Sequence, residues 1–206
     1  MSEQQPDRRA DDAVHALLAE AKTLASRDPV AALALLERQP HPDHGLFHHA
    51  RGALCLRVGR VDDAVFALEE AVRLLPDVAD IRANLGAALL ARARPPTPGA
   101  AIRRDDVVRA VRELEQACAA RPLFADAGAS LVLALELVGR AHDAIAAADA
   151  NLVRFPEDAA TLFNKASALK AAGRIEDARA TLKALVEKQP QHPAAKAASA
   201  ALTRLV

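Results

Sequence analysis

The sequence predicts an all-α protein in which pairs of helices repeat along the chain, and three observations lead to this fold class. The first is composition. Of the 206 residues, 51% are hydrophobic but only 2% are aromatic, so the apolar side chains are mostly Ala, Leu and Val. Ala and Leu favour helices, whereas a β-rich fold needs more β-branched and aromatic residues. The other two observations are a recurring turn segment and a regular spacing of prolines.

The turn segment has the form Gly-Arg-x-x-Asp-Ala and begins at Gly59, Gly139 and Gly173. In sequence number, its last two copies differ by 34 and its first two by 80, which is two periods of 34 plus 12. Prolines repeat the same period, with successive intervals of 46, 34 and 34, at Pro76, Pro122, Pro156 and Pro190. A fixed period of this length indicates a repeat protein, and its second unit carries a 12-residue insertion.

Each element of the turn has a physical role. The glycine suits the end of a helix, and the Asp or Glu that follows suits the positive N-terminus of the next helix. The proline after the second helix disfavours its continuation. The sequence therefore predicts a repeated helix–turn–helix unit.

A 34-residue period with this punctuation resembles the tetratricopeptide repeat. The resemblance implies a right-handed superhelical solenoid of four registered repeats, residues 45–78, 79–124, 125–158 and 159–192. The insertion, roughly Arg92 to Arg103, contains Pro and Arg and falls between the two helices of the second repeat. Departures from the family pattern, which we expect to weaken packing locally, fall at Val132, Ala148, Asn151 and Leu185.

The segments that flank the four repeats are less regular. Residues 1–10 are polar and are predicted to be a disordered tail. Residues 11–44 predict a degenerate helical hairpin, with a first helix from about Asp12 to Ser26 and a second, short helix after the N-cap Asp28 and Pro29. Residues 193–206 predict a single capping helix, because terminal repeats of solenoids are atypical.

In the family, the first helices of successive repeats line a concave groove, so the resemblance implies a partner segment bound there. The groove residues carried over by position are His49, Ala53, Leu56, Asp80, Asn84, Asp126, Ser130, Leu133, Phe163, Asn164, Ser167 and Lys170. Asn84 and Asn164 occupy the position whose amide often holds a bound peptide backbone in this family, the alternative being a purely local bond. The cations of the family's carboxylate clamp are missing from the matching positions.

The groove residues suggest a ligand with a basic residue near its centre, facing Asp80 and Asp126, and an apolar anchor near Phe163. The alternative is a solvated rim without ligand preference. Binding that is unchanged in an Asp80→Ala, Asp126→Ala double variant would contradict the hypothesis. The insertion is either a tolerated surface loop or a Pro-rich recognition segment.

Composition also argues against several classes of function. Lys plus Arg equals Asp plus Glu at 27 each, so the chain lacks the basic excess of a nucleic-acid binder. No apolar stretch is long enough for membrane insertion, and the polar N-terminus lacks a signal peptide, which predicts a cytoplasmic protein. Abundant Ala and the excess of Arg over Lys favour a bacterial source. Cys55 and Cys118 have no metal-type spacing and predict reduced core residues.

No catalytic motif is present, so we expect neither an enzyme nor a cofactor. Histidines cluster before and within the first repeat without a recognised metal-ligand spacing, at His41, His44, His48 and His49. The sequence thus predicts a scaffold or adaptor that binds a protein or peptide partner. The alternatives are a regulatory or substrate-recruiting component of a larger enzyme or secretion system, and a structural part that self-assembles through the Ala-rich residues 193–206.

Overall fold

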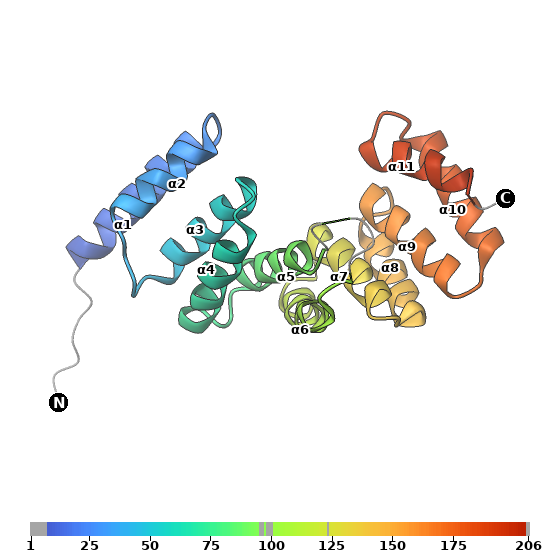
Figure 1. The fold of residues 1–206 in the computed structure, drawn as a ribbon, viewed down its shortest axis with the longest axis horizontal. Helices are drawn as coiled ribbons and strands as arrows, with labels where there is room; N and C mark the ends of the chain where they lie inside the picture. The colour runs from blue at the N-terminus through green and yellow to red at the C-terminus, as the bar shows by residue number, and fades with distance from the viewer. Residues whose placement is uncertain (1–7, 95–96, 98–100, 123, 205–206) are drawn as a thin grey trace. The chain divides into compact units, whose positions relative to one another are not determined.

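Every element of the fold is an α-helix over the residues that the computed structural model describes, namely 8–94, 97, 101–122 and 124–204 (Figure 1). The all-α class predicted from composition and period is therefore confirmed. Contacts divide the chain into two compact units, Met1–Ala88 and Leu89–Val206, here called the N-terminal and the C-terminal unit. The helices in chain order are α1 (Arg8–Ala25), α2 (Pro29–Arg38), α3 (Gly45–Arg57), α4 (Val61–Leu74), α5 (Ala79–Ala93), α6 (Arg104–Ala120), α7 (Ala125–Leu137), α8 (Ala141–Arg154), α9 (Ala159–Ala171), α10 (Ile175–Lys188) and α11 (Pro193–Leu202).

The N-terminal unit is built from two helix pairs and most of α5. Helix α1 packs on α2 and α3, α2 packs on α3, and α3 packs along α4 (Figure 1). Large apolar side chains from each pair and from α5 fill the core, because burying them is the main favourable term in folding. The fully buried ones are Leu36, Phe47, Val65, Leu68 and Ile81.

Helix α1 begins at Arg8, so residues 8–10, which were predicted to belong to a disordered tail, are helical. The prediction started the helix at the first apolar-periodic segment, but Arg and Ala extend a helix without needing any burial. Residues 1–7 lie outside the described part of the chain. The predicted cap of the second helix is confirmed, since the Asp28 carboxylate accepts hydrogen bonds from the backbone N–H of Val30 and Ala31 at 3.0 and 2.9 Å.

The three turn glycines end the first helix of their pair in the left-handed conformation. Gly59, Gly139 and Gly173 have φ of 81°, 86° and 78°. At the first of them the Gly59 N–H bonds to the Leu56 carbonyl at 3.2 Å, and the Arg60 N–H reaches back to the Cys55 carbonyl at 2.8 Å. These two bonds define a Schellman motif, which satisfies the last carbonyls of the helix. The glycine in the recurring segment therefore has the role that the sequence predicts.

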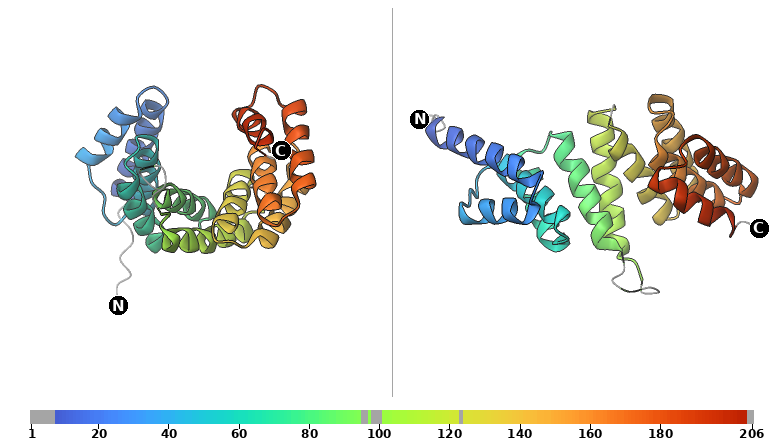
Figure 2. Two further views of the ribbon diagram at one scale, coloured as in Figure 1. Left: turned by 45° about the vertical axis from the view of Figure 1, so that its right-hand side comes forward. Right: turned by 90° about the horizontal axis from the view of Figure 1, so that it is seen from above.

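The C-terminal unit continues the pattern of pairs. Helix α7 packs on α6, α8 and α9, helix α9 packs on α8 and α10, and α11 packs on α10 and α9 (Figures 1 and 2). Because α11 contacts α9 as α9 contacts α7, it takes the place that the first helix of a further repeat would occupy. Ala195 and Ala198 face the neighbouring helices and are buried, whereas Lys196 and Ala197 are exposed.

The insertion begins later than predicted, whereas its predicted end at Arg103 agrees with the start of α6 at Arg104. Arg92 and Ala93 continue α5, which has 15 residues where α3, α7 and α9 have 13. Helix α6 is extended at its start. It begins three positions earlier in the repeat than α4, α8 and α10, and it has 17 residues where they have 14. The reason is an ion pair between the two extensions: Arg92 Nε and NH2 donate to the two carboxylate oxygens of Asp106 at 2.9 and 2.6 Å. The three prolines of the insertion lie outside the described residues.

One departure from the family pattern is compensated within its own repeat. Asn151 on α8 is buried, and its amide donates to the Thr161 hydroxyl at 2.7 Å. It faces Gly128 on α7, where an added Cβ would collide with the Asn151 amide. A large residue on one helix is therefore accommodated by the smallest residue on the other, which keeps the packing dense.

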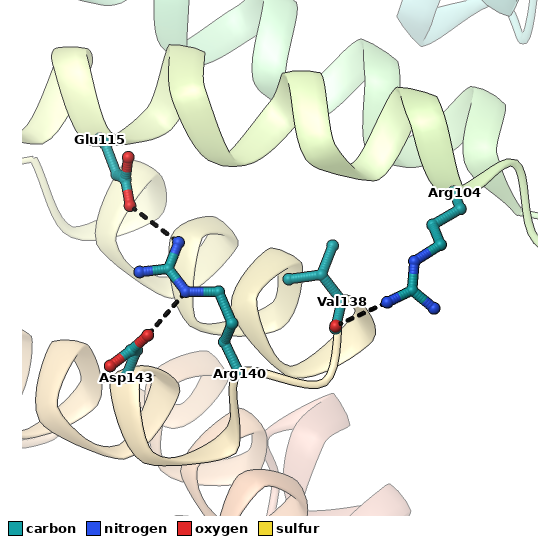
Figure 3. Close-up of polar contacts among 5 residues, drawn as sticks. All are labelled: Arg104, Glu115, Val138, Arg140 and Asp143. Carbon is teal, nitrogen blue, oxygen red and sulfur yellow. Dashed lines mark hydrogen bonds and ion pairs between the residues drawn. The ribbon is translucent and has the colours of Figure 1, made fainter.

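At two of the three turns, the arginine that follows the glycine joins neighbouring helix pairs. Arg140 donates from Nε to Asp143 at 2.6 Å and from NH1 to Glu115 on α6 at 3.5 Å (Figure 3). Beside it, the Arg104 guanidinium donates to the Val138 carbonyl at 3.2 Å (Figure 3). In the N-terminal unit, the corresponding arginine at the start of α4 bridges to a glutamate of α2 and to an aspartate of its own helix in the same way. These contacts lie at the surface, so they fix register more than they add stability.

Candidate functional site: partner-binding surfaces

In the N-terminal unit the predicted groove residues lie on α3 and α5. The Asn84 amide nitrogen is 2.7 Å from His49 Nε2. An amide nitrogen can only donate, so His49 Nε2 accepts and the imidazole is neutral. Burial lowers the pKa of His49, and the negative charge of Asp80 opposes this only in part. The Asn84 amide therefore makes a local bond between two helices, while its carbonyl oxygen still offers an acceptor.

The other predicted groove residues of this unit are two apolar residues and one acid. Ala53 and Leu56 on α3 are partly buried, and so is Asp80, one turn before Asn84 on α5. Arg57 at the end of α3 donates to the Ala25 carbonyl at 2.8 Å, which ties this surface to α1.

In the C-terminal unit the other predicted groove residues lie on α7 and α9. Asn164 donates to the Ala129 carbonyl at 2.9 Å, which again joins a first helix to the one before it. Ser130 and Leu133 are partly buried on α7, and Asp126 lies at its start. Asn84 and Asn164 thus play matching structural roles in the two units.

Three of the predicted residues converge at the C-terminal end, in what we call the α9–α11 pocket. This cavity of about 140 Å³ is lined by Phe163, Ala166, Ser167, Lys170, Leu182, Ala201 and Arg204. Ala166 and Leu182 are buried at its base, while Lys170 and Arg204 are exposed at its mouth. The pocket therefore has an apolar floor with two cations above it.

Sequence reasoning placed Phe163, Ser167 and Lys170 on the groove but missed the contribution of α11. Ala201 and Arg204 stand one full repeat period after Ser167 and Lys170, at the same repeat positions. Continuing the period into the capping helix would have found them.

The α9–α11 pocket has more positive than negative charge around it. Neither Lys170 nor Arg204 has an ion-pair partner within the described part of the chain. From the neighbouring helix α7, the Glu136 carboxylate accepts a hydrogen bond from the Ser167 hydroxyl at 3.3 Å. Lys165, one turn earlier on α9, is neutralised by Asp149 at 2.6 Å.

The histidine cluster has structural contacts. His44 Nδ1 accepts from the Phe47 N–H at 3.2 Å and so caps α3, and His48 Nε2 donates to the Pro42 carbonyl at 2.8 Å. Burial lowers the pKa of His44 despite the nearby Asp11 carboxylate. Among the described residues there is no group of three or more His, Cys, Asp or Glu that could hold a metal ion.

The two cysteines are free thiols, Cys55 buried and Cys118 partly buried. Burial raises the pKa of both thiols, so they stay protonated near neutral pH. Over the same described ranges, no helix is both long and apolar enough to span a membrane.

Stacked helix pairs that are joined by left-handed glycine turns define a helical repeat protein. Residues 137–202 match the family model described as tetratricopeptide repeat. The tetratricopeptide-repeat resemblance of the sequence is thus confirmed. Comparison with curated protein sequences finds no significant relative.

Solved structures of tetratricopeptide-repeat proteins have the same fold. The MamA crystal structure matches with a TM-score of 0.68 at 19% identity, covering 86% of this chain and 92% of MamA. YrrB, described as a TPR protein with an unusual peptide-binding site, matches with a TM-score of 0.69 at 18% identity, covering 89% and 90%. A thermophilic TPR protein of Thermus thermophilus matches with a TM-score of 0.68 at 20% identity, covering 92% and 98%.

Proposed function

We propose that the chain is a protein–protein interaction module, a scaffold or adaptor that binds an extended segment of a partner protein. The observation that carries the proposal is the α9–α11 pocket, where Phe163, Ser167 and Lys170 meet α11 around a cavity. A small concave site with an apolar base and a few polar groups is typical of a surface that anchors one residue of a partner. YrrB has the same fold and is described as having an unusual peptide-binding site, which supports this reading.

The remaining predicted groove residues belong to the same proposal. His49, Ala53, Leu56 and Asn84 would contact the segment in the N-terminal unit, where the Asn84 carbonyl oxygen is the polar group available for a backbone N–H. In the C-terminal unit, the contacts beyond the pocket would come from α7 and the Asn164 region, through Asp126, Ser130 and Leu133.

The test is affinity capture from a lysate of the source organism, followed by crosslinking and mass spectrometry. The test variant is Phe163→Ala, which removes the aromatic wall of the pocket. The matched control is Phe66→Ala, because Phe66 is 61% exposed on α4 and lines no part of the pocket. We expect crosslinks from the partner to α9 and α11 in the wild type and in Phe66→Ala, and their loss in Phe163→Ala. Capture that survives Phe163→Ala unchanged would reject the pocket as the anchoring site.

Two alternatives have distinct outcomes in the same experiment. If the captured partner is an enzyme whose activity changes on binding, or a component of a secretion system, the chain is a regulatory or substrate-recruiting part of that system. Tetratricopeptide-repeat proteins are generally interaction modules without catalysis of their own, and we propose the same here. If the chain captures only itself, α11 is the candidate contact, and a monomeric mass in solution at high concentration would exclude that reading.

We also propose a bacterial cytoplasmic setting. Arg outnumbers Lys among the 27 basic residues, with Lys at only six positions, and Ala is abundant, as in proteins of GC-rich bacterial genomes. Fractionation of cells that express the tagged chain would test the location.

A further inference from the structure

The α9–α11 pocket carries positive charge that the described part of the chain leaves unbalanced. Three arginines of the C-terminal unit are paired with acids: Arg140 with Asp143, Arg174 with Asp177 and Arg179 with Glu176. Among the described residues, no acid pairs with Lys170 or Arg204, although both line one cavity and are exposed. Two cations at one opening repel each other, so an anion between them would relieve that repulsion.

We propose that the α9–α11 pocket recognises an acidic side chain, Asp or Glu, of a partner segment, adjacent to an apolar residue that packs on Phe163. This inference rests on the proposed function and names the chemistry of its ligand. The ammonium of Lys170 and the planar guanidinium of Arg204 both donate to carboxylates, and arginine can do so through two parallel N–H groups. Below them, Ala166, Leu182 and Ala201 offer apolar surface to the neighbouring residue.

The size of the cavity favours a single side chain. Its volume of about 140 Å³ is close to the ~150 Å³ of a cavity that holds one benzene molecule. A nucleic acid would need a longer basic track, and the net charge of the chain is zero. We assign the carboxylate to a side chain within the partner segment and not to its C-terminus, because a segment that runs along the first helices continues beyond the pocket. The apolar anchor near Phe163 agrees with the sequence hypothesis, and the charge preference at this end is acidic.

Selectivity of the site involves one further acid. Glu136 faces the pocket from α7 through its hydrogen bond with Ser167 but does not line the cavity. Its negative charge weakens the attraction of the two cations for a carboxylate. Glu136→Gln should therefore tighten the binding of an acidic segment, whereas loss of either cation should weaken it.

The experiment is selection of a random peptide library displayed within a phage coat-protein loop, so that no peptide has a free C-terminus. The baits are the wild-type chain, a Lys170→Glu, Arg204→Glu variant and a matched Lys183→Glu, Lys196→Glu control. The control makes the same charge change at residues of α10 and α11 that do not line the pocket. Circular dichroism and thermal unfolding establish that all three baits are folded.

We expect wild type and control to enrich Asp or Glu beside an apolar residue, and the pocket variant to enrich Lys or Arg instead. For one selected peptide, fluorescence anisotropy should give about tenfold weaker binding to the pocket variant, and affinity should fall as salt is raised.

Peptides that bind without an acidic preference would overturn this inference and leave the proposed function standing. So would an acidic preference that the pocket variant retains. Enrichment only in a second library with free C-termini would assign the site to a terminal carboxylate and overturn the side-chain assignment. If neither library yields a peptide, the inference fails together with the proposed function.

Discussion

Replacing Arg92 with Ala should destabilise the C-terminal unit, because it leaves the Asp106 carboxylate buried without its main partner. The side chain of Asp106 is 10% exposed and that of Arg92 is 20% exposed, and two hydrogen bonds join them. Exposed ion pairs contribute less than about 1 kcal/mol, whereas breaking a fully buried pair costs about 3–5 kcal/mol. This pair lies between those limits, so we expect a loss of about 2 kcal/mol in the free energy of unfolding.

Urea unfolding followed by circular dichroism measures this loss. The matched control is Arg94→Ala, because Arg94 is exposed just beyond the end of α5. A double-mutant cycle with Asp106→Ala isolates the energy of the pair from other effects of each substitution. If Arg92→Ala and Arg94→Ala unfold at the same urea concentration, the ion pair does not hold the base of the insertion and the reasoning is refuted.

The same pair should make stability depend on pH. Hydrogen bonds from Arg92 are the largest cause that lowers the pKa of Asp106 in the folded chain, and they outweigh the opposite effect of burial. The folded state therefore binds this proton less readily than the unfolded state, so the stabilisation is complete above the unfolded pKa of about 3.9. It is lost as pH falls through the lower folded pKa. The difference between wild type and Arg92→Ala should shrink over that acidic range.

Three other predictions concern packing, backbone and the N-terminal unit. Gly128→Ala should destabilise by about 1–3 kcal/mol because its Cβ meets the Asn151 amide, and adding Asn151→Ala should recover part of that loss in urea unfolding. Gly173→Ala should cost about 1 kcal/mol because its φ is 78°, and since an added Cβ would meet no neighbouring atom, the whole cost would come from the backbone. A midpoint of thermal unfolding equal to that of the wild type would contradict this. Burial lowers the pKa of His49, so the imidazole should become protonated only when the pH falls below about 6.5. Protonation should break its hydrogen bond with Asn84, and the Asn84 side-chain amide resonance should then shift.

The periodic part of the fold could be predicted because its signals are local. The glycine at each turn is required by a left-handed backbone, and Asp28 caps a helix whose start its neighbour Pro29 marks. Such signals act within a few residues, so they can be read without knowing the tertiary contacts. The same holds for the helix pairs, which repeat with the period that the prolines and turn glycines mark.

What could not be predicted depends on contacts between segments. Nothing local to Arg92 shows that it continues α5, since the reason is an Asp106 carboxylate 14 residues away. Asn151 departs from the family pattern, and the sequence alone does not show that Gly128 on the facing helix makes room for it. For Asn84 and Asn164 the sequence left a local bond open as the alternative, but the partner of each bond on the preceding first helix follows from packing alone.

The closed base of the insertion makes the second repeat a natural attachment point. The Arg92–Asp106 pair and the hydrogen bond from the Arg103 N–H to the Ala93 carbonyl, 3.1 Å long, hold the two helix ends together. The chain between them can therefore change in length or sequence while the flanking helices keep their register. Each doubling of a flexible loop costs only about 0.6 kcal/mol in closure entropy. A fluorescent reporter or a second recognition domain could be carried here, on a repeat separate from the α9–α11 pocket, without rebuilding the scaffold.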